Sequence, residues 1–100
     1  MADQLSRVFA ALSDPIRRDL LARLAVADAT VGQLAAPYDV TVQAVSKHLK
    51  VLQDAGLVES REAGTQNIYA VRLQGFRDVR EFVDSFWSVA LSKLEEMARR

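Results

Sequence analysis

Residues 41–52 of this chain of 100 residues read TVQAVSKHLKVL. Apolar residues recur in the stretch every three or four positions, which is the spacing of one face of an α-helix. Thr41 stands where a helix N-cap is expected, and Gly56 stands where helices commonly end in a left-handed residue. We therefore predict an amphipathic helix, and its buried stripe is expected to be Val42, Val45, Leu49 and Leu52.

The opposite face of this predicted helix is polar and basic, and it carries Gln43, Ala44, Ser46, Lys47 and Lys50. A polar helix face is most often simply solvated, and the stretch taken alone allows that interpretation. The same residue types can also contact DNA, because Gln pairs with adenine, Lys pairs with guanine, and Ala contacts the methyl group of thymine. The surrounding sequence has to decide between the two interpretations.

The chain before this stretch predicts two helices. Apolar spacing places the first over about residues 3–12. The second begins after Asp14, with Pro15 in the first-turn position that proline favours. Asp28 and Ala29 are expected to form a simple connection. The polar residues of the second helix are expected to face solvent, and they are Arg17, Arg18, Asp19 and Arg23.

A third, short helix is predicted to start after Thr30 and to end before Pro37, because the residue that precedes proline avoids helical angles. A corner at residues 38–40 joins it to the helix that begins after Thr41. Two short helices joined by such a turn form a helix-turn-helix arrangement, which is expected over about residues 30–55.

The period of the apolar residues changes from about 3.6 to about 2 after the fourth helix. Residues 57–62 and 67–73 are predicted to be two strands of a wing, joined by small and polar residues at 63–66. Helical spacing returns with apolar residues from 76 to 97 and predicts a helix of about 24 residues, roughly 36 Å long. The expected fold class is therefore mainly α with a small β-hairpin. It is a single winged helix-turn-helix domain spanning residues 1–100, with its wing at about 57–73.

The last predicted helix is too long for one such domain to cover, so part of its apolar face would be exposed in a monomer. The same residues could belong to the core only. Pairing of about residues 3–12 and 76–98 with a second copy would bury them, and we favour such a homodimer. Two-fold symmetry would place the two reading helices about 34 Å apart, which predicts an inverted repeat in DNA. The expected interface residues are Leu5, Val8, Phe9, Val79, Val83, Phe86, Trp87, Leu91 and Leu94.

Composition limits the class of protein. Lys and Arg total 13, as do Asp and Glu, which disfavours a non-specific nucleic-acid binder that depends on counterion release. The absence of cysteine excludes disulfides and thiolate metal sites. No apolar run approaches the ~20 residues that span a bilayer, and nothing at the N-terminus suggests export, so we expect no membrane contact and a cytoplasmic protein. The sequence has no phosphate-binding glycine loop and no cysteine nucleophile, so we expect no enzyme.

Two runs of the sequence carry a family resemblance. Residues 9–18, FAALSDPIRR, and residues 45–58, VSKHLKVLQDAGLV, resemble the ArsR/SmtB family of bacterial transcriptional repressors, and the wing at 61–69 is similar too. The resemblance covers essentially the whole chain. It implies a homodimer that binds a double-stranded DNA operator and represses transcription, often of its own operon, until a signal releases it.

The sequence departs from the metal-binding members of that family. Where they carry a cysteine pair in the third helix, this chain has VGQLA at residues 31–35, and residues 76–100 contain no histidine. We therefore expect no metal and no cofactor. Carboxylates of the last helix could serve only a hard, oxygen-binding ion. A sensor of such an ion, or of a small organic effector near Phe86 and Trp87, stays open as an alternative.

In helix-turn-helix motifs the second helix enters the major groove, so this placement and the resemblance favour DNA contact by the polar face. His48, the only histidine, either is half-buried and bonded to backbone or contacts a phosphate. Arg61 is expected to contact flanking phosphates from the wing. A winged helix that binds another protein is the remaining alternative. The predicted DNA-contacting residues are Thr41, Gln43, Ala44, Ser46, Lys47, His48, Lys50, Arg61, Thr65 and Gln66.

Overall fold

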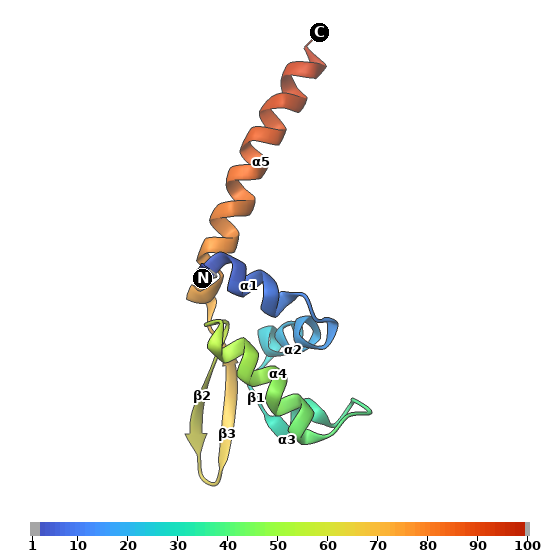
Figure 1. Ribbon diagram of the computed structural model, residues 1–100, viewed down its shortest axis with the longest axis vertical. Coiled ribbons are helices and arrows are strands. Elements are labelled where there is room, and N and C mark those ends of the chain that lie inside the picture. The colour runs from blue at the N-terminus through green and yellow to red at the C-terminus, as the bar shows by residue number, and fades with distance from the viewer. Residues whose placement is uncertain (1–2, 100) are drawn as a thin grey trace.

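The computed structural model describes residues 3–99, and over this range the chain forms helices packed beside a small sheet, with one helix extending away from them (Figure 1). The predicted order of a mainly helical winged helix-turn-helix is confirmed. The elements are α1 (Gln4–Leu12), α2 (Pro15–Val26), β1 (Ala29–Thr30), α3 (Val31–Ala35), α4 (Val42–Asp54), β2 (Val58–Ala63), β3 (Gln66–Val71), the 3₁₀ helix η1 (Leu73–Phe76) and α5 (Arg77–Ala98).

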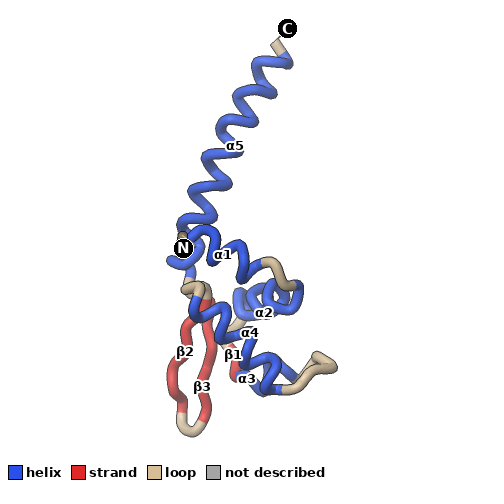
Figure 2. The backbone as a smooth tube through the Cα atoms, in the orientation of Figure 1, coloured by secondary structure: helices blue, strands red, loops and turns tan. Residues whose placement is uncertain are grey.

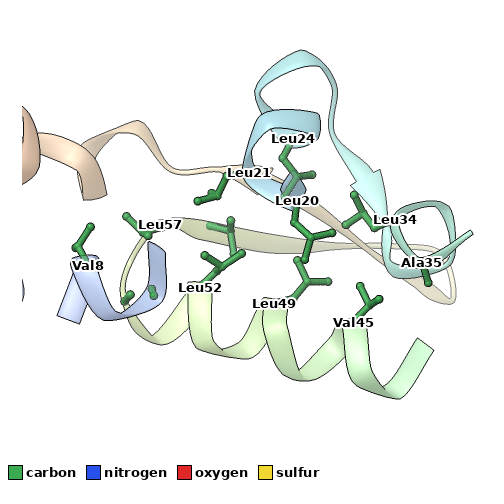
Figure 3. Packing of buried hydrophobic residues seen from close by; sticks show 13 residues of the cluster. Val8, Leu20, Leu21, Leu24, Leu34, Ala35, Val45, Leu49, Leu52 and Leu57 are labelled. Atoms are coloured by element: carbon green, nitrogen blue, oxygen red, sulfur yellow. The ribbon is translucent and has the colours of Figure 1, made fainter. Parts of the chain in front are cut away.

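Helix α4 is the predicted amphipathic helix, and it lies along one side of the hydrophobic core (Figure 3). The Oγ1 atom of Thr41 accepts a hydrogen bond from the backbone N–H of Ala44 at 3.1 Å, so the predicted N-cap is confirmed. This bond leaves the hydroxyl hydrogen of Thr41 free for another acceptor. Val42 is 45% exposed, and its predicted burial is wrong because the first turn of the helix extends past the core. The buried face of α4 consists of Val45, Leu49 and Leu52.

The other elements cover this buried face from the opposite side (Figure 3). Helix α2 contributes Leu20, Leu21 and Leu24 to the same cluster. Helix α1 contributes Val8, which is 0% exposed. The prediction that Val8 faces a second subunit is therefore wrong, because its side chain is enclosed by the core of its own subunit.

The sheet has three antiparallel strands in the order β1-β3-β2, which is one strand more than the predicted hairpin. The additional strand β1 lies where a simple connection is expected from the sequence. It pairs Ala29 with Tyr69 and Thr30 with Ile68 of β3. Two residues are too few to show a period of apolar residues, so only the tertiary pairing reveals this strand.

The predicted hairpin is confirmed as β2 and β3, which pair in one register from Val58 opposite Val71 to Ala63 opposite Gln66. Its turn is Gly64-Thr65, shorter than the predicted connection at residues 63–66. Gly64 has a φ of +65°, which glycine adopts without steric cost. The turn lies at the end of the molecule opposite α5 (Figure 1).

Arg23 of α2 does not face solvent, contrary to the sequence-based expectation. Its guanidinium donates to the carbonyl oxygens of Leu34 at 2.7 Å and Gln33 at 3.1 Å, and it lies 5.5 Å from the ring centroid of Tyr38. The Tyr38 hydroxyl donates to the carboxylate of Asp19. Burial and this hydrogen bond raise the pKa of Tyr38 above its usual value, so the hydroxyl keeps its proton. These contacts hold the turn between α3 and α4 against α2.

Helix α5 extends away from the other elements as a single rod (Figures 1 and 2). The molecule therefore measures 63 Å along its longest axis but only 30 and 22 Å along the others. None of the α5 residues, all of which lie in the described range, is buried. At its base, Phe82 packs edge-to-face on Phe9 of α1, with 5.9 Å between the ring centroids.

The start of α5 is fixed against the end of α4 by a backbone contact. A Cβ atom at Gly75 would lie 1.9 Å from the carbonyl oxygen of Gly56. The side chain of Gln4 donates to the carbonyl of Ala55 at 3.0 Å, and Arg72 donates to the carbonyl of Gly56 at 3.3 Å. One junction therefore joins α1, α4 and α5, and we call it the Gly56–Gly75 junction.

We expect Gly75→Ala to lower the free energy of unfolding by about 1–3 kcal/mol, because the added methyl group meets backbone atoms that cannot rotate away. Gly32→Ala is the matched control. The nearest atom to a Cβ at Gly32 is 3.9 Å away, and alanine is the better helix former inside α3. Chemical denaturation of both variants measures the difference, and equal stabilities would contradict the packing at the junction.

Candidate nucleic-acid interface

The exposed face of α4 carries Gln43, Lys47 and Lys50 on the side opposite the core. Residues three and four positions apart are neighbours on a helix surface, so these side chains form one continuous strip. We call these three residues the recognition face. Ala44 and Ser46, which are predicted contacts too, are half-buried on its two flanks.

The wing approaches α4 on the flank that carries Ser46. A hollow of about 340 Å³ opens there, lined by residues of α4, the start of α3 and the hairpin. It brings together three of the predicted contact residues, Ser46, Thr65 and Gln66, from two distant parts of the sequence. Asn67 lines the same hollow and is not among the predicted contacts. The wing therefore adds polar groups beside one flank of the recognition face.

Two of the basic side chains predicted to contact DNA are paired with carboxylates. The Nζ atom of Lys50 lies 2.9 Å from Oδ1 of Asp54, one turn further along α4. The Nη1 atom of Arg61 in β2 lies 3.1 Å from Oδ2 of Asp28, which precedes β1. Lys47 forms no ion pair within residues 3–99. Both exposed pairs contribute little to stability, but any DNA phosphate that contacted Lys50 or Arg61 would have to compete with them.

His48 lies on the flank of α4 away from Ser46 and is half-buried. Its Nδ1 atom is 3.2 Å from Nη1 of Arg17, so in place of the backbone bond in the half-buried alternative its partner is a side chain. Its contact with phosphate stays a prediction. The expectation that Arg17 faces solvent is wrong. Its side chain is only 15% exposed, because it donates to the carbonyls of Ala11 at 2.7 Å and Ala10 at 3.3 Å.

Helix α5 presents an apolar surface where the sequence predicts contact with a second copy. Of the residues predicted to contact the second copy, Leu5 and Val79 are half-buried and so keep some exposed surface. Val8 is enclosed by its own subunit, as described above. Phe82 and Val89 are exposed as well and extend this surface beyond the predicted stripe. The remaining predicted interface residues are exposed, and they are Phe9, Val83, Phe86, Trp87, Leu91 and Leu94.

Within residues 3–99 there is no group of three or more His, Cys, Asp or Glu side chains placed to hold a metal ion. The carboxylates of α5 form no such group either. Over the same range, no helix combines the length and the apolar character that crossing a membrane requires.

A helix-turn-helix whose second helix exposes a polar and basic face beside a β-hairpin defines the class of winged helix-turn-helix DNA-binding proteins. Comparison with known families agrees with this class. The family described as "Helix-turn-helix domain" matches residues 12–61, which contain α2, α3, α4 and the start of the wing.

Two characterised proteins are similar to most of the chain. The HTH-type transcriptional regulator Rv2034 of Mycobacterium tuberculosis is 43% identical over 86 residues, which are 86% of this chain and 80% of that protein. The Transcriptional repressor SdpR of Bacillus subtilis is 30% identical over 74 residues, which are 74% of this chain and 82% of that protein.

Two solved structures are similar in fold and sequence. The ArsR family transcriptional regulator RHA00566 matches with a TM-score of 0.81 and 32% identity, over 87% of this chain and 96% of that one. The homodimeric winged helix-turn-helix DNA-binding domain of Mb0332 from Mycobacterium bovis matches with a TM-score of 0.67 and 31% identity, over 94% and 84%. This chain belongs to the ArsR/SmtB family of winged helix-turn-helix proteins, and it is a DNA-binding transcriptional regulator.

We expect Asp28→Asn to strengthen DNA binding by about two- to fivefold, because the carboxylate of Asp28 competes with phosphates for Arg61. Arg61→Ala alone should weaken binding to all sequences alike and reduce the salt dependence. Mobility-shift titrations over a range of salt concentrations measure both effects. In the Arg61→Ala background, Asp28→Asn should change nothing. The same gain in that background would show general repulsion between Asp28 and DNA, and would contradict the competition.

Proposed function

We propose that this protein is a homodimeric repressor that binds an inverted-repeat operator in its own or a neighbouring operon and needs no metal to do so. The observation that carries the proposal is the recognition face, which is exposed on the second helix of a helix-turn-helix with the wing beside it. Similarity to the repressor SdpR supports repression, and similarity to the homodimeric Mb0332 domain supports two subunits. The protein acts on DNA in the cytoplasm and is not an enzyme.

In this proposal the recognition face enters the major groove and reads base edges. Gln43 pairs with adenine, Lys47 pairs with guanine, and Ala44 contacts a thymine methyl group. Lys50 and Arg61 exchange their carboxylate partners for phosphates, which positions the helix but carries no sequence information. The remaining hydrogen-bonding groups near these contacts come from Thr41, Ser46, Thr65 and Gln66.

A second subunit is needed for useful affinity. The chain carries 13 basic and 13 acidic side chains, so one subunit gains little from counterion release. The apolar surface of α5 supplies the contact with a second copy, because exposed side chains such as Phe86 and Leu94 would leave water on pairing. Two-fold symmetry then sets the two recognition faces on successive turns of one side of DNA, about 34 Å apart.

Mobility shift with a duplex from the region upstream of its own gene tests the proposal. At moderate salt we expect the protein to prefer this duplex over an unrelated duplex of equal length, with no loss of affinity in EDTA. Equal binding of both duplexes by an intact dimer would rule out an operator in this region, and release by EDTA would rule out metal independence.

Gln43→Ala should cost about 1–3 kcal/mol of binding free energy and relax the preference at one base pair in the same mobility-shift assay.

We expect Leu94→Arg to shift the protein to monomers, because Leu94 is 61% exposed in one subunit and would become buried, next to other apolar residues, in the proposed dimer. An unpaired charge there should raise the dimer dissociation constant about 30-fold or more. Ser88→Arg, on the polar side of the same helix, is the control and should leave the dimer intact. Sedimentation equilibrium distinguishes the two outcomes. An unchanged dimer in Leu94→Arg would place the interface elsewhere.

A further inference from the structure

We infer that Arg17 is a positioning residue for DNA binding. It fixes the ring of His48 so that the Nε2–H group faces outward and donates to a DNA phosphate on the side of the recognition face away from the wing. The inference rests on the proposed entry of α4 into the major groove. It adds a phosphate contact to those proposed for Lys50 and Arg61, and this added contact does not involve a charged side chain.

The guanidinium of Arg17 is itself held firmly. Its Nε atom donates to the carbonyl of Ala11 at 2.7 Å and its Nη2 atom to the carbonyl of Ala10 at 3.3 Å, both near the end of α1. Positive charge is favourable at this end of a helix. With its side chain only 15% exposed, Arg17 has little freedom to move, so its Nη1 atom and the N–H groups on it are held in a fixed place.

Asp14 is the acidic neighbour of this guanidinium, with Oδ2 4.0 Å from Nη1 of Arg17. Its Oδ1 atom caps α2 by accepting from the backbone N–H groups of Ile16 at 2.8 Å and Arg17 at 3.2 Å. Desolvation acts to raise the pKa of Asp14, but the hydrogen bonds from these N–H groups and the positive charge of Arg17 hold it below its usual value. The carboxylate therefore stays charged and helps to retain Arg17 at this place.

The contact with Arg17 determines which nitrogen of His48 carries the proton. A guanidinium can only donate hydrogen bonds, so Nδ1 of His48, 3.2 Å from Nη1 of Arg17, must accept. A neutral imidazole has one protonated nitrogen, and in His48 this is Nε2. The outward-facing nitrogen is therefore a donor, which is what a phosphate oxygen requires.

The Nε2 atom of His48 is not sealed inside the protein. Within residues 3–99, every fully enclosed side-chain nitrogen or oxygen of a buried or half-buried residue has a hydrogen-bond partner. Among these described residues, the only hydrogen bond of the His48 ring is the one at Nδ1. Nε2 is therefore not fully enclosed, although the residue as a whole is half-buried.

Because of its position on α4, His48 faces one DNA strand in the proposed complex, and the wing faces the other strand. At 3.6 residues per turn, His48 and Ser46 lie about 200° apart around the helix, with the recognition face between them. A helix with its side chains is about 10–12 Å wide and fills a major groove of about 12 Å, so its two flanks face the two sugar–phosphate backbones. Ser46 and the wing serve one backbone, and His48 serves the other.

Two substitutions of His48 separate its two nitrogens. The amide of Asn reaches the place of Nδ1, so His48→Asn keeps a partner for Arg17 but loses the outward donor. The longer Gln reaches the place of Nε2. We expect His48→Asn to weaken binding about tenfold, equally on the upstream duplex and on an unrelated one, without changing the salt dependence. His48→Gln should restore most of the lost affinity.

Ethylation interference shows the phosphate directly. Modification of one phosphate in each half-site should block the wild-type protein but have no added effect on His48→Asn. Arg17→Lys keeps the charge but cannot reach both α1 and His48, so it should weaken binding several-fold in the wild-type background and not at all beside His48→Asn. This non-additivity is what a purely structural role of Arg17 would not produce.

Equal losses in His48→Asn and His48→Gln, or an unchanged interference pattern, would overturn the inference. Additive losses from Arg17→Lys and His48→Asn would overturn the positioning role. If Arg17→Lys fails to fold, the pair of His48 variants still tests the contact. Equal wild-type binding to both duplexes would contradict the proposed function alone, because the phosphate contact is expected on any duplex.

Discussion

Helix α4 buries one face in the core and leaves the opposite face exposed. The other elements of the fold pack against the buried face and hold the helix in this orientation. Leu49 and Leu52 are wholly enclosed in the core. Burial of each such side chain contributes about 1.5–3 kcal/mol, so the core fixes the rotation of α4 about its own axis. The directions of Gln43 and Lys47 are fixed with it. In the proposed mode of binding, recognition of DNA therefore depends on packing contacts that never touch the DNA.

The charges of the chain restrain what one subunit can do. Three Lys and Arg side chains on α4 and the wing are predicted to contact DNA. Lys50 and Arg61 already face carboxylates, and Lys47 is the one that has no ion pair within residues 3–99. Since each neutralised phosphate releases about one counterion, such a surface binds random DNA weakly. In the proposed dimer a correct site engages two such surfaces at once. Selectivity then comes from the base contacts and from symmetry, because the electrostatic attraction to any duplex is small.

Local signals in the sequence are enough to predict the helices, the hairpin and the N-cap at Thr41, because these depend on residues a few positions apart. Contacts between distant residues are not predictable in this way. Arg17 and His48 are separated by 31 positions, and a polar residue on a helix is ordinarily assigned to solvent. Val8 shows the same limit, since periodicity identifies an apolar face but not whether its own core or a partner covers it.

The Gly56–Gly75 junction links the position of α5 to that of α4. Backbone lies directly on backbone there, and tightly packed contacts of this kind do not deform gradually. The angle between the recognition face and α5 is therefore a property of the fold. In the proposed dimer, the distance between the two recognition faces follows from this angle and from how the α5 helices meet. A change at the base of α5, where Phe9 meets Phe82, would alter the spacing of the two faces and leave the chemistry of each face unchanged. Because half-sites recur only at about 34 Å, a small change in spacing is enough to weaken binding.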